Sequence, residues 1–357
     1  MGLGRIVLGK NQERRLRSGH LWVFSNEIET IEEAPEPGGE TLVLDRRGGI
    51  VGVGLYNPHS LIAVRLFARR QRPIDEALFR ERIQRAVELR KRILPVEETY
   101  RVVFSEGDFL PGLIVDRYGE YLSVQSLTLG IEKRIEMVLD LLQETLKPTG
   151  IICRRDSRSR SHEQLPMTEP IYRGQVPDRI DTPYEGFVLE TDLKGGQKTG
   201  EFLDQRENRK RVAQESRGRR VLDLYCHTGL FSLQCAAAGA ASVVGVDSSG
   251  PAIARARNNH RRNASTRPVE FREGAAKYEA LNASAMRLIP AGGMIASASC
   301  SHHVDATAFL DILRASAKKA GAAFRVVEVR GQSRDHPMLL AMRETSYLTM
   351  VLAERIH

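Results

Sequence analysis

Cysteines and long apolar runs are both scarce in this sequence of 357 residues. The four cysteines, Cys153, Cys226, Cys235 and Cys300, form no C-x-x-C pair, so their spacing predicts neither a disulfide framework nor a zinc site. Free thiols are typical of a reducing compartment, and we expect a cytoplasmic protein. No apolar run approaches the roughly 20 residues of a membrane span, and the first residues lack the apolar core of a secretory signal. A membrane partner is therefore not expected.

Acidic residues are outnumbered, with 45 Asp and Glu against 53 Lys and Arg and a net charge of +8. Most of the basic residues are arginines, whose planar fork matches phosphate oxygens. The excess therefore favours a nucleic-acid partner, although the same charge could serve solubility alone. The run 154–160 is dense in Arg and Ser. It is predicted to be either a solvated loop or a loop that contacts phosphates.

The first half of the chain changes its periodicity twice. Residues 5–68 hold short apolar or alternating runs between turn residues, which predicts an all-β domain. Apolar residues then recur at helical spacing over 74–94, with Asp75 as the expected N-cap, which predicts one connecting helix. Residues 99–190 mix strands with a helix and predict a small α+β domain.

From about residue 200, strands alternate with helices, which is typical of a parallel sheet covered by helices. The fold class predicted for this part is α/β. Its expected strands are 221–225, 242–247, 268–272, 294–300, 325–330 and 347–353. The predicted domains are 1–70, 71–190 and 191–357.

The turn after the first of these strands carries a chemical signal. Asp223 lies near the end of the strand, and Gly229 opens the next helix. Asp247 ends the second strand roughly 20 residues later, where an acid can accept the ribose hydroxyls of a nucleoside. The turn is not G-x-G-x-x-G, and an acid stands where a dinucleotide needs a bare anion-binding turn. S-adenosylmethionine, a cation without phosphate, fits better than a nicotinamide cofactor, and a generic strand–turn–helix is the alternative without a ligand.

A second signal is Cys300, at the end of the expected strand 294–300. Ligands of an open α/β sheet bind at the carboxyl ends of its strands, so Cys300 would face the same ligand as Asp223. A thiolate there can act as a nucleophile in a positive environment, whereas most free cysteines are small buried apolar residues. His302 and His303 follow, but adjacent residues of a strand point in opposite directions, and no metal is expected.

Taken together, several motifs resemble those of the 23S rRNA cytosine-C5 methyltransferases that carry an N-terminal PUA domain. The resemblance spans almost the whole chain, and its most specific motifs lie in the last domain. It rests on segments 13–24, 54–60, 112–119, 202–209 (F-L-D-Q-R-E-N-R), 223–229 (D-L-Y-C-H-T-G), 299–303 (S-C-S-H-H) and 331–337 (G-Q-S-R-D-H-P).

The resemblance implies a class I, Rossmann-like methyltransferase domain after an all-β PUA domain and a small α+β domain. It implies S-adenosyl-L-methionine as the cofactor and rRNA as the substrate, and it is compatible with a homodimer. Cys300 would be the catalytic nucleophile that adds to C6 of the target cytosine. The implied cofactor-binding residues are Phe202, Asp204, Gln205 and Arg206 at the methionine end, Asp223, Tyr225 and Gly229 at the amino-acid part, and Asp247 at the ribose.

One part of the family pattern is missing. The family has an acidic residue that contacts adenine, then a fourth strand that ends in Asp-Pro-Pro. Here 273–276 (E-G-A-A) runs directly into Lys277, and Asp-Pro-Pro occurs nowhere in the chain. On the order of 30 residues are absent if a βαβ crossover is the yardstick. Because the fourth strand lies beside the first at the centre of such a sheet, its loss leaves both neighbours unpaired.

Two explanations follow from this gap. Either the sequence omits a segment of the natural protein, or the segment is lost and the domain is inactive. Both flanks keep the family pattern, which favours omission. The predicted function is an S-adenosylmethionine-dependent methyltransferase that forms 5-methylcytosine in large-subunit rRNA through a Cys300 adduct. The alternative is a non-catalytic RNA-binding protein with a decayed methyltransferase domain.

Overall fold

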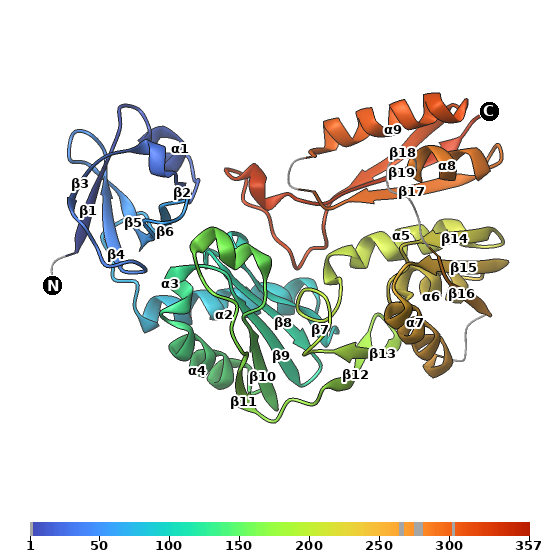
Figure 1. Cartoon of the computed structure of the whole chain (residues 1–357), viewed down its shortest axis with the longest axis horizontal. Helices are drawn as coiled ribbons and strands as arrows, with labels where there is room; N and C mark the ends of the chain where they lie inside the picture. The colour runs from blue at the N-terminus through green and yellow to red at the C-terminus, as the bar shows by residue number, and fades with distance from the viewer. Residues whose placement is uncertain (1–2, 264–267, 275–280, 302–303) are drawn as a thin grey trace. The chain divides into compact units, whose positions relative to one another are not determined.

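The computed structural model describes residues 3–263, 268–274, 281–301 and 304–357 (Figure 1). The junction between Ala276 and Lys277 and the pair His302 and His303 lie outside this description. Two compact units are present, and each is assembled from three separate stretches of chain. The first holds Met1–Pro183, Thr191–Leu203 and Arg334–Thr345, and the second holds Tyr184–Glu190, Asp204–Ser333 and Ser346–His357.

The N-terminal part of the first unit is a six-stranded sheet in the order β2-β6-β5-β4-β1-β3. Its pairs are antiparallel except for β1 with β4, which run parallel. Alternate residues such as Ile6, Val43 and Val64 are fully buried, and the single tryptophan, Trp22, packs against this core. The elements are β1 Gly4–Leu8, α1 Glu13–Arg17, β2 Trp22–Val23, η1 Ser25–Glu27, β3 Ile28–Glu33, β4 Glu40–Leu44, β5 Ile50–Tyr56 and β6 Val64–Ala68.

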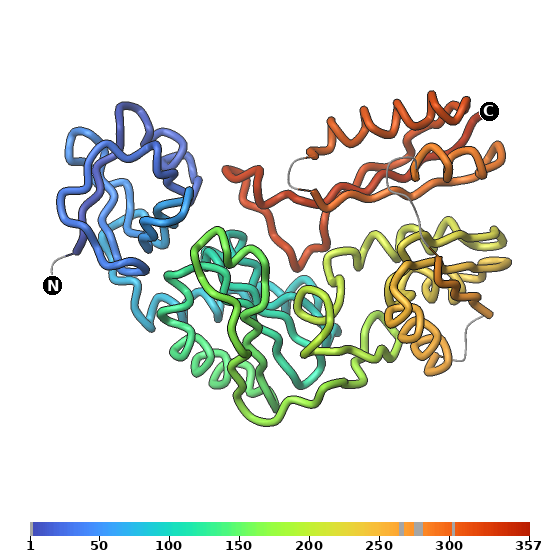
Figure 2. The backbone as a smooth tube through the Cα atoms, in the orientation of Figure 1, coloured from blue at the N-terminus to red at the C-terminus, as the bar shows by residue number. Residues whose placement is uncertain are grey.

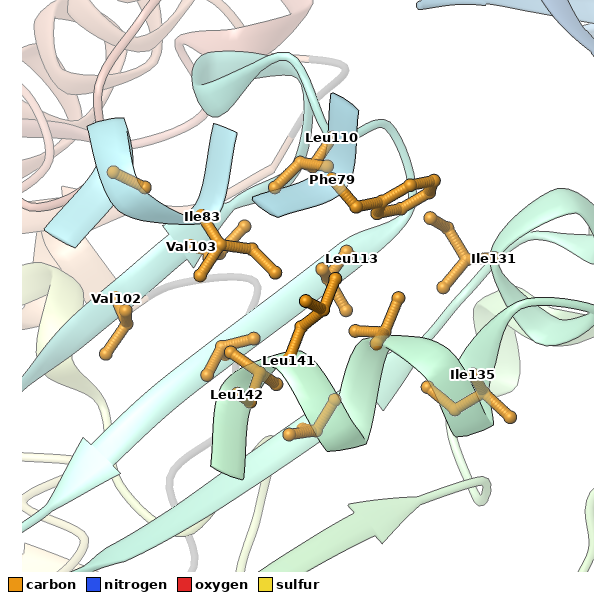
Figure 3. Packing of buried hydrophobic residues seen from close by; sticks show 14 of the residues in the cluster. Phe79, Ile83, Val102, Val103, Leu110, Leu113, Ile131, Ile135, Leu141 and Leu142 are labelled. Atoms are coloured by element: carbon orange, nitrogen blue, oxygen red, sulfur yellow. The ribbon is translucent and has the colours of Figure 1, made fainter. Parts of the chain in front are cut away.

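A second core of the first unit lies under helix α2, Glu76–Ile93, whose predicted cap is confirmed because the Asp75 side chain accepts a 3.0 Å hydrogen bond from the Leu78 amide. Phe79 and Ile83 of this helix pack toward a sheet in the order β11-β10-β9-β8-β7 (Figure 3). The single helix expected within residues 99–190 is two helices, α3 and α4. The elements are β7 Thr99–Phe104, η2 Ser105–Asp108, β8 Leu113–Tyr118, β9 Tyr121–Ser126, α3 Leu129–Glu132, α4 Ile135–Leu146, β10 Gly150–Arg154, η3 Arg158–Glu163 and β11 Ile171–Gly174.

The two ends of the arginine-rich run 154–160 are buried, while Asp156, Arg158 and Ser159 between them are exposed. Arg154 is 6% exposed and Arg160 only 1%. The Arg160 guanidinium donates to Glu132 at 2.9 Å and to the carbonyl oxygen of Ser126 at 2.6 Å. The prediction of a surface loop is therefore wrong for Arg154 and Arg160, which bond acceptors of the same unit, while Arg158 between them is exposed.

The second unit carries the strand–helix alternation. Strands β14, β15 and β16 form a parallel sheet, and β17, β19 and β18 an antiparallel one, seen in orange to red in Figure 2. Before them in the chain, β12 Arg179–Tyr184, which belongs to the first unit except for Tyr184, pairs with β13 Phe187–Asp192, which belongs to the second unit as far as Glu190. The elements are η4 Leu203–Gln205, α5 Arg206–Ser216, β14 Arg220–Leu224, α6 Leu230–Ala237, β15 Ser242–Asp247, α7 Gly250–Arg262, β16 Val269–Glu273, α8 Leu281–Leu288, β17 Met294–Ser299, α9 Ala306–Ala320, β18 Phe324–Arg330, η6 Arg343–Thr345 (which belongs to the first unit) and β19 Thr349–Arg355.

The sheet of the second unit is interrupted. Among the described residues β14 pairs only with β15, and β17 pairs only with β19. Leu222 in the middle of β14 is 49% exposed, although the strands of a parallel sheet are normally covered on both faces. All five residues of β10 in the first unit are buried, by contrast. An interrupted sheet is the expected consequence of the missing fourth strand.

None of the helices in the described part of the chain is long and apolar enough to cross a membrane.

Candidate cofactor site and the exposed cysteine

The turn after β14 has an unusual backbone. Tyr225, His227 and Gly229 all have positive φ angles, of 60°, 50° and 86°. The Cys226 amide donates to the carbonyl oxygen of Val246 at 3.1 Å, which ties the turn to β15. A Cβ atom on Gly229 would lie 2.8 Å from the Phe271 ring, so glycine is required by space as well as by φ. The turn therefore brings backbone close to the carboxyl end of the sheet.

Asp223 stabilises this turn from within. Its Oδ2 accepts hydrogen bonds from the amide of Ser232 at 3.1 Å and from the hydroxyl of Ser232 at 2.7 Å. Burial, with a smaller contribution from the charge of Asp247, raises the pKa of Asp223 to about 6, and the Ser232 bonds oppose this shift. A cationic group bound beside this carboxylate would favour its ionised form.

Asp247 ends β15 and holds two loops. Its Oδ2 accepts a hydrogen bond from the His227 amide at 2.9 Å, and its Oδ1 accepts one from the Ser249 amide at 2.9 Å. Each carboxylate oxygen has a further lone pair, so both can still accept hydroxyl protons from a ligand. Asp223, Tyr225, Gly229 and Asp247 thus lie together at the carboxyl edge of β14 and β15, and the 37% exposed Tyr225 is the most open of them.

The other candidate cofactor residues lie around the start of α5. Asp204 is 2% exposed, and its Oδ2 accepts a 2.7 Å hydrogen bond from the hydroxyl of Tyr347. Gln205 accepts a 2.7 Å hydrogen bond from Asn208. Arg206 is 1% exposed, with its guanidinium 4.7 Å from the centroid of the Tyr184 ring. These contacts fix the shape of the segment.

Phe202 belongs to the first unit. The ammonium of Lys198 lies 4.4 Å from the centroid of the Phe202 ring, at cation–π distance.

Cys300 follows β17 and is exposed, whereas the other three cysteines are buried. Burial raises the pKa of the Cys153 thiol to about 12 and that of the Cys235 thiol to about 11, and it also raises the pKa of Cys226. Those three thiols therefore stay protonated near neutral pH. Cys300 is the thiol that the structure leaves accessible to a substrate, on the three-stranded sheet that does not contain Asp223.

Asn259 is a supporting residue that the sequence analysis missed. It is fully buried on α7. Its side chain donates to the carbonyl oxygen of Thr228 at 3.1 Å and accepts from the Glu190 amide at 2.9 Å. A signal was available, because Asn259 shares a helical face with the buried residues Ile253 and Ala256 at a spacing of three. A polar residue on an apolar helical face indicates a buried hydrogen-bonding role.

The part of the chain that the structure describes contains no group of three or more His, Cys, Asp or Glu side chains placed to hold a metal ion.

Comparisons with known proteins agree with this geometry. Residues 6–69 match the family of PUA-like domains, and residues 168–272 match that of S-adenosylmethionine-dependent methyltransferases. The chain is 32% identical to a ribosomal RNA large subunit methyltransferase I of Shewanella denitrificans, over 98% of both chains. The chain belongs to this methyltransferase family. It is therefore built as an enzyme that uses S-adenosylmethionine, with a PUA-like domain before the methyltransferase fold.

Solved structures show the same fold. A protein of Streptococcus mutans described as a SAM-dependent methyltransferase has a TM-score of 0.85 at 15% identity, covering 98% of this chain and 99% of that one. A methyltransferase crystallised in complex with SAH has a TM-score of 0.84 at 14% identity, with 98% and 99% covered.

The family alignment is longer than this chain. It runs over 391 positions with the Shewanella protein, 34 more than the 357 residues present here. At least that many positions of the relative therefore have no counterpart in the chain. This size agrees with the loss of one strand and its connections between β16 and α8.

Proposed function

We propose that this methyltransferase forms 5-methylcytosine in large-subunit rRNA, with Cys300 as the nucleophile. The observation that carries the proposal is that Cys300 is exposed at the carboxyl end of β17 in a chain of this family. The net charge of +8 and the PUA-like domain support an RNA substrate. The relatives that match are named for the large-subunit rRNA on which they act.

Cytosine C5 is a weak nucleophile, which explains why the reaction needs a thiolate. The Cys300 thiolate would form a bond to C6 of the cytosine, and the electron pair of the C5–C6 double bond would then be available at C5. Bound S-adenosylmethionine supplies an electrophilic methyl group on a sulfonium. A base would next remove the C5 proton after methyl transfer, and the bond between C6 and the Cys300 sulfur would break, which restores the thiolate.

The described side chains fit such a cofactor. Asp247 and Asp223 present carboxylates at the edge where ligands of an open α/β sheet bind. Asp247 would accept the ribose hydroxyls, and Asp223, Tyr225 and Gly229 would hold the amino-acid part. The methionine end would lie against Phe202, Asp204, Gln205 and Arg206.

The proposal extends to the organisation of the chain. Residues 1–70 would bind RNA as a PUA-like domain. Residues 71–190, a connecting helix and an α+β middle domain, would join it to residues 191–357, which would catalyse methyl transfer. Action on ribosomal RNA fits the cytoplasm, and a homodimer is compatible with the family.

A Cys300→Ala variant tests the nucleophile. We expect loss of methyl transfer to rRNA, measured with tritiated S-adenosylmethionine, together with unchanged affinity for S-adenosylhomocysteine. The matched control is Cys153→Ala, which removes a buried thiol of the first unit and should keep activity. Full turnover by Cys300→Ala would exclude the covalent mechanism.

The interrupted sheet favours a second candidate, an RNA-binding protein with a decayed methyltransferase domain. Calorimetry with S-adenosylhomocysteine separates the two, since a decayed domain gives no heat of binding. The intact mass of the protein from its natural source then shows whether a segment of several kilodaltons is missing from the sequence. A mass that matches the sequence, with no heat of binding, would support the decayed domain.

A further inference from the structure

Phe109 combines two features that rarely occur together. It ends η2 in a left-handed conformation, with φ 58° and ψ 27°, where the helix end favours glycine. A bulky side chain with positive φ is a backbone outlier. Phe109 is also 43% exposed, while its neighbour Leu110 is fully buried beside Phe79 (Figure 3). The aromatic ring is therefore held at the surface at a conformational cost.

Arg82 of α2 lies against this ring. Its guanidinium donates to the carbonyl oxygens of Phe109 and Phe67 and lies 6.0 Å and 5.5 Å from the centroids of their rings. Burial, together with the charges of Arg72 and Arg85, lowers the pKa of Arg82 to about 10. It stays charged at neutral pH, and its backbone acceptors carry no compensating negative charge.

One carboxylate serves the two neighbouring arginines. Glu81 accepts from Arg72 at 2.7 Å through Oε2 and from Arg85 at 2.8 Å through Oε1. The Arg85 side chain is 74% exposed. Arg72 and Arg85 thus share one acid, which also acts electrostatically on Arg82, so three guanidiniums are balanced by one carboxylate beside an exposed aromatic ring.

We propose that Arg72, Arg82, Arg85 and Phe109, here called the arginine patch, bind a single-stranded segment of the RNA substrate. The proposal rests on the proposed function, which makes RNA the substrate. Arginines neutralise phosphates, and an aromatic ring stacks on a base without regard to its sequence. A ring that is exposed despite backbone strain fits such a contact, because strain of this kind persists at functional sites.

RNA is favoured over a protein partner by the charge of the patch. Aromatic and arginine side chains also form protein hot spots, but those lie in apolar, desolvated centres. Here the surroundings of Phe109 are charged, and Arg69 and Arg70 add two more exposed arginines just before Arg72. This surface therefore provides the phosphate contacts that the buried Arg154 and Arg160 do not.

Fluorescence anisotropy with a labelled 12-nucleotide uridine RNA and the full chain tests the patch. Phe109→Gly should weaken binding about 10-fold while the variant melts at the same or a higher temperature, because glycine relieves the strained φ. Phe109→Tyr should retain affinity. Arg85→Gln should lower the slope of log affinity against log salt by about 0.7, the loss of one phosphate contact.

The matched control is Arg314→Gln on α9, whose side chain is 78% exposed and is likewise paired with one acid, Asp311. It should change neither affinity nor the salt slope. If both Phe109→Gly and Arg85→Gln bind the RNA as tightly as the parent chain does, the proposal is overturned, and a protein partner for the patch is favoured instead. In methylation assays the patch variants should raise the KM for rRNA and leave kcat unchanged. A parent chain that binds the RNA but does not methylate would contradict the proposed function and not the patch.

Discussion

At the scale of one residue, the buried carboxyl of Asp223 has a cost in stability and a proposed role in cofactor binding. Its pKa of about 6 lies above the ordinary value of 3.8 for an aspartate, chiefly because of burial. A raised carboxyl pKa in the folded state stabilises the fold below about pH 4, and this contribution is lost as pH rises through about 6. The residue therefore costs stability at neutral pH, and the proposed role of its carboxylate in binding the cationic cofactor would offset this cost.

The pH dependence of cofactor affinity should follow the ionisation of the Asp223 carboxyl. We expect the affinity for S-adenosylhomocysteine to rise between pH 5 and pH 7 as Asp223 ionises. The amino group of the ligand stays protonated over this range, so the ionised carboxylate attracts it. In Asp223→Asn the affinity should be lower and independent of pH in this range, while the ligand-free protein at pH 7 should gain about 1 kcal/mol. Calorimetry and urea unfolding measure the two effects, with Asp311→Asn as the control. A pH dependence that survives in Asp223→Asn would assign the titration to another group.

At the scale of elements, α7 connects the turn after β14, proposed above to hold the cofactor, to strand β13. Asn259 contacts both, and Asn263 at the end of the helix bonds Val188 through Val188's amide and carbonyl groups, each at 2.9 Å. These bonds join β13 to residues at the end of α7 that lie more than 60 positions later in the sequence. Long-range side-chain bonds of this kind fix a short strand that its own hairpin would leave marginal.

Replacing Asn259 tests this connection. Asn259→Ala leaves the Glu190 amide and the Thr228 carbonyl without their buried partner, which should cost about 2 kcal/mol of unfolding free energy. The affinity for S-adenosylhomocysteine should fall as well, because the cofactor turn loses a hydrogen bond. Urea unfolding is the measurement, and the exposed Gln84→Ala on α2 is the control. A loss below about 0.5 kcal/mol would mean that water replaces the amide at low cost.

At the scale of the whole molecule, both units use parts of the chain that are distant in sequence. Asp335 belongs to the first unit, where its Oδ2 accepts a hydrogen bond from the Arg101 amide at 2.9 Å. Its carbonyl oxygen accepts one from Arg90 at 2.7 Å. Asp335 of the motif 331–337 thus contributes buried hydrogen bonds to a unit made mainly from the first half of the chain.

The interrupted sheet leads to a prediction at this scale. Inserting the corresponding segment of a family member between Ala276 and Lys277 should pair β14 and β17 and raise stability. Hydrogen exchange measured by mass spectrometry should then slow in 220–224 and 294–299, and hardly change in β10. A Gly-Ser insert of equal length is the control. Equal exchange in the two inserted proteins would mean that the missing segment does not form the central strand.

The sequence by itself determined the PUA-like domain before the methyltransferase fold, the Asp75 cap and most strands of the second unit. These features depend on local periodicity and on residues close together in the chain. Only the tertiary structure decided that Arg154 and Arg160 are buried, that Asp223 bonds Ser232 and that Asn259 holds β13. The physical reason is that the environment of a polar side chain depends on partners that long-range folding brings to it. A single sequence contains the residue but not its neighbours in space.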